Sequence, residues 1–277
     1  MQNLTTRVLS ALVAVFTLFA VVYFFKLTGL IIFSSLVVIV GIYEMSRLLF
    51  SKTGLEDKDI KIEKNYFFSW AVLIFLSLVF SKYQKYGYEI LIVIFIIVSL
   101  RTIINHKKFN SIDQIFSYIS KFMVGIFYST VLPALIINIL KIENTGIYWF
   151  LFLLATVFAG DIGAYIFGSL FGKTKLAPLL SPKKSLEGSL GGLLFSGLIG
   201  LIFSYLILGH PVYIMVGLGF FGGLFGQVGD FFESLLKRLA GVKDSGSIMP
   251  GHGGVLDRLD GVYFASPLFY IVINYII

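Results

Sequence analysis

The chain lacks cysteine altogether and contains only three histidines among its 277 residues. Without cysteine there can be no disulfide, no thiol nucleophile and no Cys-ligated metal site. The histidines, His106, His210 and His252, are far apart in the sequence, which argues against a metal site built from several imidazoles. The lack of cysteine therefore excludes thiol chemistry, and the scattered histidines make a site with several histidine ligands improbable.

Charged residues are scarce as well. Asp, Glu, Lys and Arg make up 13% of the chain, whereas a soluble domain carries roughly 25%. With 57% hydrophobic residues, the composition predicts an all-α polytopic integral membrane bundle. The net charge of +7 suits anionic lipid headgroups or nucleotides. Nucleic acid is not an expected partner, because the basic residues lie between apolar runs.

Long apolar runs set the number of predicted membrane helices. A bilayer-crossing helix needs about 20 apolar residues, and the pattern predicts about nine. The first run is expected to be a retained helix rather than a signal peptide, because no small-x-small cleavage site follows it. The predicted spans are 8–25, 28–49, 65–81, 88–105, 120–140, 147–171, 188–208, 212–236 and 261–277.

The positive charges are distributed unevenly between the two ends of these spans. Eighteen of the 22 Lys and Arg residues lie at the N-terminus and in the loops after spans 2, 4, 6 and 8. The other four are Lys26, Lys82, Lys85 and Lys141. The positive-inside rule therefore predicts a cytoplasmic N-terminus and an external C-terminus. A multi-pass protein of the cell inner (cytoplasmic) membrane is expected.

The candidate site residues lie mainly in the second half of the chain. Residues 1–145 are predicted to form N-terminal transmembrane helices with little site chemistry, although Glu44 lies within span 2. Residues 146–277 are predicted to form a C-terminal transmembrane region that carries a cytoplasm-facing catalytic site.

The segment 234–260 has the highest density of polar chemistry. Its basic side chains suit phosphate oxygens, and its glycines permit close approach of the backbone to a ligand. A histidine there is a candidate acid or base. The candidates in this segment, apart from two aspartates, are Lys237, Arg238, Lys243, Asp244, Gly246, His252, Gly253, Gly254 and Arg258.

Three aspartates form a candidate cation site. Asp257 and Asp260 are spaced i, i+3, so they share a face on a helical turn. With Asp230 they could hold Mg²⁺, which takes oxygen ligands. Asp230 continues a stripe of small residues in span 8, predicted to pack closely against neighbouring helices: Gly219, Gly222, Gly223, Gly226 and Gly229. A structural ion pair, or a helix-start signal at Asp260, is the alternative.

A second cluster, residues 181–188, precedes span 7. Ser185 is predicted to cap the following helix, whose N-terminal end favours anions. Lys183 and Lys184 would add positive charge for a phosphate, or they could serve only as a positive-inside anchor. Asp161, within span 6, marks either a cavity or a partnered structural charge, and both interpretations remain open.

These residues resemble a known family. The pattern in segment 234–260 resembles the signature of phosphatidate cytidylyltransferases (CDP-diacylglycerol synthases), with Met249 where that family usually has Leu, Ile or Phe. Asp161 and the cluster 181–188 also resemble the family, and the likeness covers about residues 150–277. The matching string is Ser234-x2-Lys237-Arg238-x4-Lys243-Asp244-x-Gly246-x3-Pro250-x-His252-Gly253-Gly254-x2-Asp257-Arg258-x-Asp260.

The resemblance implies a magnesium-dependent reaction at the membrane. CTP and phosphatidate would give CDP-diacylglycerol and pyrophosphate. Asp230, Asp257 and Asp260 would be the metal-site carboxylates. A homodimer is left open. The residues expected to bind substrate are Asp161, Lys183, Lys184, Ser185, Glu187, Gly246, Gly253 and Gly254.

Two other functions compete with this interpretation. A CDP-alcohol phosphatidyltransferase also uses membrane-embedded aspartates, and Asp257-x2-Asp260-Gly261 matches the start of its motif. That motif continues with Ala-Arg and two further aspartates, which are missing here. A transporter with a polar pathway along spans 6 to 8 would distribute its charged positions through the membrane, whereas here they gather at one face.

Overall fold

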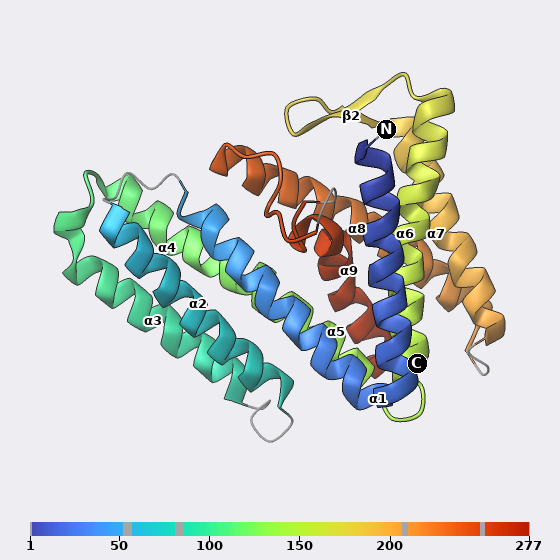
Figure 1. The fold of residues 1–277 in the computed structure, drawn as a ribbon, viewed down its shortest axis with the longest axis horizontal. Coiled ribbons are helices and arrows are strands. Elements are labelled where there is room, and N and C mark those ends of the chain that lie inside the picture. The colour runs from blue at the N-terminus through green and yellow to red at the C-terminus, as the bar shows by residue number, and fades with distance from the viewer. Residues whose placement is uncertain (1, 52–56, 81–85, 207–209, 250–252, 277) are drawn as a thin grey trace. The chain divides into compact units, whose positions relative to one another are not determined.

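The structure is a computed structural model, which describes residues 2–51, 57–80, 86–206, 210–249 and 253–276 (Figure 1). Side chains are not described for residues 2–12, 14, 15, 18, 19 and 88. The chain forms two compact units. The first comprises Met1–Ala134 with Leu239–Leu256, and the second comprises Leu135–Arg238 with Asp257–Ile277. The loop 239–256 therefore belongs with the N-terminal helices, whereas the sequence divided the chain at a single point.

The first unit is built mainly from four helices, α1 (Gln2–Leu49), α2 (Asp57–Val79), α3 (Gly87–Ile104) and α4 (Ile112–Ile126). A short 3₁₀ turn, η2 (His106–Lys108), lies between α3 and α4. The π-helical turn η3 (Phe127–Val131) continues α4 into α5 (Leu132–Leu140), where the second unit begins. Lys26 interrupts α1 with a φ of 51° and a ψ of −144°. This break falls between the predicted spans 8–25 and 28–49.

Aromatic residues fill the core of this first unit. Phe67 and Phe122 are fully buried and meet edge to face, with ring centroids 5.1 Å apart. Phe50 packs on both Phe67 and Tyr118. A Cβ on Gly125 would lie 2.4 Å from Leu49 Cδ1, so the absence of a side chain there lets α4 pack closely against α1. These contacts between aromatic rings form a buried core shared by α2, α4 and the end of α1.

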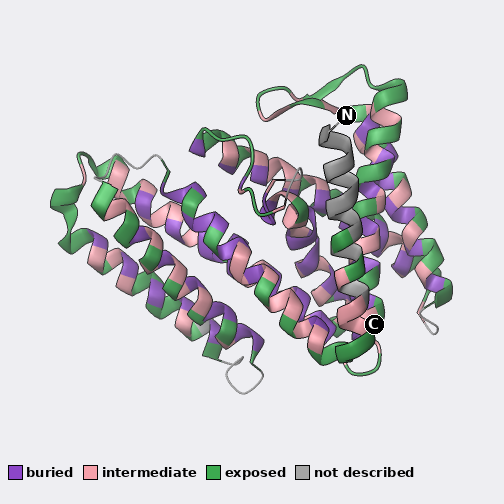
Figure 2. Ribbon diagram, viewed as in Figure 1, coloured by how far each residue is buried: buried purple, intermediate pink, exposed green. Residues whose placement is uncertain are grey.

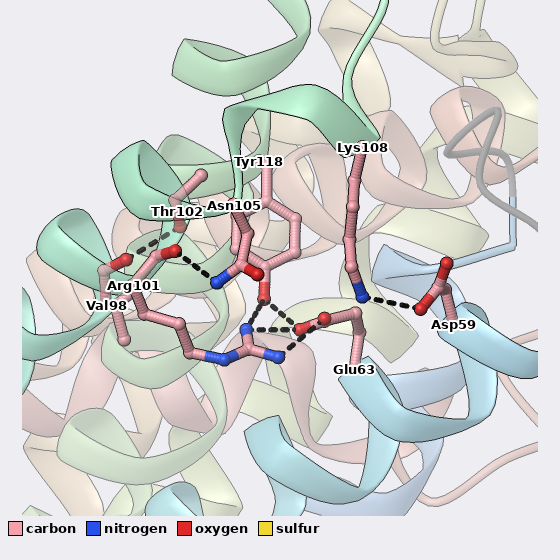
Figure 3. A network of polar contacts seen from close by, with 8 residues as sticks. All are labelled: Asp59, Glu63, Val98, Arg101, Thr102, Asn105, Lys108 and Tyr118. Atoms are coloured by element: carbon pink, nitrogen blue, oxygen red, sulfur yellow. Dashed lines mark hydrogen bonds and ion pairs between the residues drawn. The ribbon is translucent and has the colours of Figure 1, made fainter.

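A buried ion pair joins three helices of the first unit (Figure 3). The two terminal nitrogens of Arg101 in α3, Nη1 and Nη2, each donate to one oxygen of the Glu63 carboxylate in α2 at 2.7 Å. The Tyr118 hydroxyl in α4 donates to the same carboxylate. The Arg101 guanidinium also lies 4.2 Å from the centre of the Tyr66 ring. Bidentate pairs of this kind are geometrically specific, so the network fixes how α2, α3 and α4 meet.

Replacing Arg101 with methionine is expected to destabilise the protein by about 3 kcal/mol, because it leaves the Glu63 carboxylate buried without its cation. Glu63 has a side chain only 5% exposed. The free energy of unfolding can be measured by SDS titration in mixed micelles. The control is Lys108→Met, which breaks the more exposed pair with Asp59 (2.6 Å) and should cost less than about 1 kcal/mol. Equal effects of the two substitutions would contradict this role of Arg101.

The second unit contains α6 (Gly146–Phe171), α7 (Leu186–Leu206), α8 (Val212–Ala240) and α9 (Leu256–Tyr275), of which α9 begins at the edge of the first unit. Small residues bring α6 and α7 close together. A Cβ on Gly163 would lie 2.8 Å from the Gly191 carbonyl oxygen, and one on Gly192 would lie 2.8 Å from the Gly160 carbonyl oxygen. This is the close backbone approach that small residues permit in membrane helices.

The glycine stripe of α8 packs as predicted. A Cβ on Gly219 would lie 2.4 Å from the Ser196 carbonyl oxygen in α7, and one on Gly223 would lie 2.3 Å from Ser196 Oγ. Gly222 faces Phe269 in α9, with 2.7 Å to the ring. The stripe is therefore a packing face toward α7 and α9.

The loop between α6 and α7 contains a β-hairpin, which the all-α prediction did not include. Strand β1 (Lys175–Ala177) pairs antiparallel with β2 (Ser181–Ser185), and Lys175 lies opposite Ser185. No alternation of apolar and polar residues signals these strands, because the hairpin is short and mostly exposed. The helices α6 and α7 fix the two ends of the hairpin.

Six helices of the described chain are long and apolar enough to cross a membrane. The protein is thus an all-α polytopic membrane protein apart from its hairpin. Large apolar side chains such as Ile92 and Phe95 of α3 are exposed, while Ile94 and Val98 are buried. Figure 2 shows exposed and buried residues alternating along the helices. Exposed apolar surface of this extent is expected where a helix faces lipid. The six segments are Ala20–Leu49, Asp57–Val79, Ile112–Leu140, Gly146–Phe171, Leu186–Leu206 and Val212–Ala240.

Candidate active site

A cavity of ≈ 450 Å³ lies within the second unit, between α6, the hairpin, α7 and α8. Its lining brings together predicted site residues that are far apart in the sequence. They are Asp161 of α6, Lys184 of the cluster 181–188, and Asp230 of α8. The cavity therefore resolves the open question about Asp161 in favour of a cavity residue. The lining residues are Asp161, Ala164, Tyr165, Gly168, Ser169, Leu176, Lys183, Lys184, Ser185, Gly188, Ser189, Gln227, Asp230 and Phe231.

An ion pair between Lys184 and Asp230 spans the cavity wall. Lys184 Nζ donates to the carboxylate of Asp230, and it also lies 4.6 Å from the centre of the Phe231 ring. The side chains of Lys184 and Asp230 remain 31% and 34% exposed. A partly solvated cation at a cavity wall can exchange its carboxylate partner for a phosphate oxygen, since both are charge-assisted acceptors.

Ser185 lines the cavity at the start of α7, and Glu187 follows it in the first turn of that helix. Ser185 Oγ accepts a hydrogen bond from Gly188 N at 3.2 Å, which confirms the predicted cap at the start of α7. Glu187 accepts from the backbone N–H groups of Lys173 (3.0 Å) and Thr174 (3.1 Å). Its carboxylate thus holds the segment just before the hairpin, and the substrate contact that the resemblance implied stays a prediction.

Asp260 adjoins Asp230 because α8 and α9 meet at a glycine. A Cβ on Gly229 would lie 2.4 Å from the Asp260 carbonyl oxygen, so only glycine allows the helices this close. Asp260 lies in the first turns of α9, ahead of its apolar stretch. Burial, and then the charge of Asp230, raise the pKa of Asp260 to about 7, and Asp161 adds to the same effect. Three carboxylates therefore interact electrostatically at this end of the unit.

Lys237 links α8 to the start of α9. Its Nζ donates to Glu233 at 2.6 Å and to Asp257 at 2.7 Å. Glu233 is buried, with a side chain 1% exposed. Lys237 thus forms two ion pairs in this structure, and its predicted contact with phosphate stays a prediction. Glu233 was not among the predicted site residues, although its i, i+4 spacing from Lys237 is a recognisable signal.

Gln227 is a second residue that the sequence prediction missed. It lines the cavity one helical turn before Asp230. Its side-chain oxygen accepts from Ser189 Oγ, and its Nε2 donates to the Ser189 carbonyl at 3.0 Å. Only its i, i+3 spacing from Asp230 could have indicated that it shares that face.

The remaining predicted residues lie in or near the α8–α9 loop. Gly253 adopts a φ of 85° and its carbonyl accepts from Met249 N at 3.0 Å, so glycine is needed there for its conformation. Gly246 and Gly254 pack around Glu44 of α1. His252, like Pro250 of the signature, lies outside the described residues. Four predicted residues of the segment 234–260 are exposed: Arg238, Lys243, Asp244 and Arg258.

Within the described part of the chain, no three Asp, Glu or His side chains lie close enough together to hold a metal ion. In particular Asp257 is engaged by Lys237, whereas Asp230 and Asp260 are brought together by Gly229. The structure therefore pairs two of the three predicted carboxylates.

Comparison with known proteins identifies the family of the chain. The sequence profile of the cytidylyltransferase family matches residues 5–276. The chain belongs to this family. The match includes the first half of the chain, where the sequence resemblance rested on hydropathy alone. The N-terminal helices of this chain therefore belong to the region that it shares with the family.

Curated relatives of this cytidylyltransferase carry a more specific name. The phosphatidate cytidylyltransferase of Staphylococcus aureus (strain COL) is 39% identical over 184 residues, which cover 65% of this chain and 66% of the relative. That of Staphylococcus epidermidis (strain ATCC 12228) is similar to the same extent. The Staphylococcus haemolyticus protein is 37% identical over 177 residues, or 62% of this chain and 64% of the relative. The matched stretch thus spans just under two thirds of each relative.

Proposed function

We propose that this cytidylyltransferase transfers the cytidylyl group of CTP to phosphatidate, giving CDP-diacylglycerol and pyrophosphate. The observation that carries the proposal is the cavity in which Lys184 and Asp230 meet, because it combines phosphate-binding and acidic groups at one end of apolar helices. Curated relatives named phosphatidate cytidylyltransferase support the same reaction.

The chemistry requires positioning and charge neutralisation rather than an activated side chain. A phosphatidate oxygen is already an anionic nucleophile. It would attack the α-phosphorus of CTP, and the bond between the α-phosphorus and the bridging oxygen to the β-phosphorus would break to release pyrophosphate. Lys184, with the exposed Lys183 beside it, would neutralise phosphate charge in this step. This accounts for a site that combines bases and acids without a Ser-His-Asp arrangement.

Magnesium fits the carboxylates that α8 and α9 bring together. Mg²⁺ is usually held by one or two carboxylates together with substrate phosphates and water, so a third protein carboxylate is not required. Asp230 and Asp260 supply oxygen donors beside a cavity that contains Lys184. Asp257 would first have to give up its ion pair with Lys237. When bound, the ion would supply charge stabilisation for the pyrophosphate leaving group.

The assay that tests the function uses purified protein, phosphatidate in detergent micelles, and CTP labelled at the α-phosphate. Label should enter the lipid fraction when Mg²⁺ is present, and CTP labelled at the γ-phosphate should yield labelled pyrophosphate in equal amount. Release of CMP from CDP-diacylglycerol and an alcohol would instead indicate a phosphatidyltransferase. Absence of transfer with both labels would reject the proposal, as a transporter would predict.

We further propose nine membrane crossings in the cytoplasmic membrane, with the N-terminus inside. The uneven distribution of Lys and Arg supports this orientation. The break of α1 at Lys26 supports two crossings within that helix. In this topology the α8–α9 loop and the cavity face the cytoplasm, where CTP is present.

Single cysteines can test this topology, since the chain has no native cysteine. Ser247 is exposed in the α8–α9 loop and Glu143 is exposed between α5 and α6. With an impermeant thiol reagent on whole cells, we expect Glu143→Cys to be labelled and Ser247→Cys to be protected. Permeabilised cells should label both. The opposite pattern in whole cells would reverse the orientation.

A further inference from the structure

Glu44 of α1 is a buried carboxylate that contacts the α8–α9 loop, 200 residues further along the chain. It is 1% exposed. Its Oε2 accepts a hydrogen bond from the backbone N–H of Leu256 at 3.0 Å and lies 3.3 Å from Ser245 Oγ, a donor in the same loop. All of these residues belong to the first compact unit. The carboxylate therefore joins two points of the loop that are eleven residues apart.

Two signature glycines are required by this carboxylate. A Cβ on Gly246 would lie 2.1 Å from Glu44 Oε1, and a Cβ on Gly254 would lie 2.6 Å from Glu44 Oε2. The same Cβ on Gly254 would lie 2.1 Å from Ser245 Oγ. No side chain fits at these distances. The backbone at Gly246 and Gly254 thus packs directly against the Glu44 carboxylate. The lack of a side chain at these two positions is what allows the contact.

The hydrogen bond to Leu256 also acts at the beginning of α9. The first N–H groups of a helix have no acceptor within the helix, and a carboxylate is a favourable partner for that end. Leu256 is the first residue of α9, and Asp257 and Asp260 follow one and four positions later. An acceptor supplied by α1 therefore holds the segment from which both aspartates project.

A second contact from α1 lies at the other end of the loop. Ser51 Oγ, just beyond α1, lies 3.4 Å from the carbonyl oxygen of Ala240, the last residue of α8. The loop is therefore held near the end of α8 by Ser51 and near the start of α9 by Glu44. A buried charge is costly unless it is hydrogen-bonded. The donors of the loop therefore stabilise the buried carboxylate of Glu44, and Glu44 in turn holds the loop.

We infer that Glu44 is a positioning residue for the reaction: it closes the α8–α9 loop and sets the start of α9, so that Asp260 is held beside Asp230. Only the effect of Glu44 on catalysis rests on the proposed function. The anchoring of the loop is a separate claim and can be tested without substrate.

The test compares Glu44→Gln with Glu63→Gln. Both replace a buried carboxylate of the first unit with a neutral group of the same size. Glu63, however, bonds to Arg101 and Tyr118 and to no described residue of the loop. In each background a nitroxide is attached to Ser247→Cys, whose position is exposed in the loop. We expect the spectrum to report a more mobile loop in Glu44→Gln and an unchanged loop in Glu63→Gln.

Kinetics supply the second measurement. Loss of a group that orients metal-site residues costs about 10- to 100-fold in activity. Per folded molecule, Glu44→Gln should therefore lose at least about tenfold in kcat, with little change in the KM for CTP, while Glu63→Gln should keep its kcat and only unfold more easily. Unchanged loop mobility, or an unchanged kcat, in Glu44→Gln would overturn the inference. If the parent protein transfers no cytidylyl group, the proposed function fails, and the nitroxide spectra still decide whether Glu44 holds the loop.

A double substitution checks that the glycines act through Glu44. Gly246→Ala should by itself mobilise the nitroxide, because its Cβ would collide with the Glu44 carboxylate. In a Glu44→Ala background the same substitution should add no further mobility, since the colliding group is gone. Additive effects of the two substitutions would contradict the contact.

Discussion

Asp260→Asn is expected to lower kcat by about 10³-fold while the protein remains folded. Asparagine keeps the size of the side chain and removes the negative charge, which an oxygen-ligand site for Mg²⁺ needs. Asp260 is the carboxylate that the contact between α8 and α9 at Gly229 brings next to Asp230. Its loss should therefore remove stabilisation that develops with the leaving pyrophosphate, and the measurement is the steady-state rate at several Mg²⁺ concentrations.

Asp113→Asn is the matched control for this substitution. Asp113 is exposed in the first turn of α4, so the same change of charge there should leave kcat within about twofold, since the residue lies outside the groups that act on the reaction. Near-normal turnover of Asp260→Asn at low Mg²⁺ would show that its carboxylate does not support the metal.

Lys184→Gln is expected to lower kcat/KM for CTP by about 10²-fold, because it removes a cation aimed at developing phosphate charge. Lys184 pairs with Asp230 and lies over the Phe231 ring, so its ammonium group is held in one place at the cavity wall. The individual values of kcat and KM then tell whether Lys184 acts on bound CTP or on the transition state.

Lys175→Gln provides the comparison for Lys184. Lys175 is an exposed lysine of β1 on the same hairpin, and it is absent from the residues that line the cavity. Its loss changes the net charge of the hairpin by the same amount and should leave kcat/KM nearly unchanged. Equal losses in the two variants would mean that general positive charge, rather than a placed ammonium group, accounts for the effect.

Many features of the fold follow from patterns within a few turns of a helix. The apolar runs predicted α6 at 147–171 and α8 at 212–236, and the structure has them at Gly146–Phe171 and Val212–Ala240. The cap at Ser185 and the packing role of the glycine stripe were also predicted correctly. In each case the deciding interactions lie within one helix or one turn, so the sequence nearby contains the necessary signal.

Other contacts depend on partners that are distant in the sequence. Lys237 forms ion pairs with Glu233 and Asp257, and its predicted contact with phosphate stays a prediction. Glu187 accepts from the N–H groups of Lys173 and Thr174, and its predicted contact with substrate stays a prediction. The sequence near a charged side chain does not show which partner it meets in the folded protein.

The sequence by itself determined that this is a membrane protein, where most of its helices lie, and which family its polar segments resemble, because composition, hydropathy and motif spacing are properties of the chain. Only the tertiary structure decided that Asp161, Lys184 and Asp230 share one cavity. It likewise decided that Glu44, in a half of the chain with little evident chemistry, accepts from the first residue of α9. The reason is physical: such contacts form between residues tens to hundreds of positions apart, and they exist only once the helices have packed.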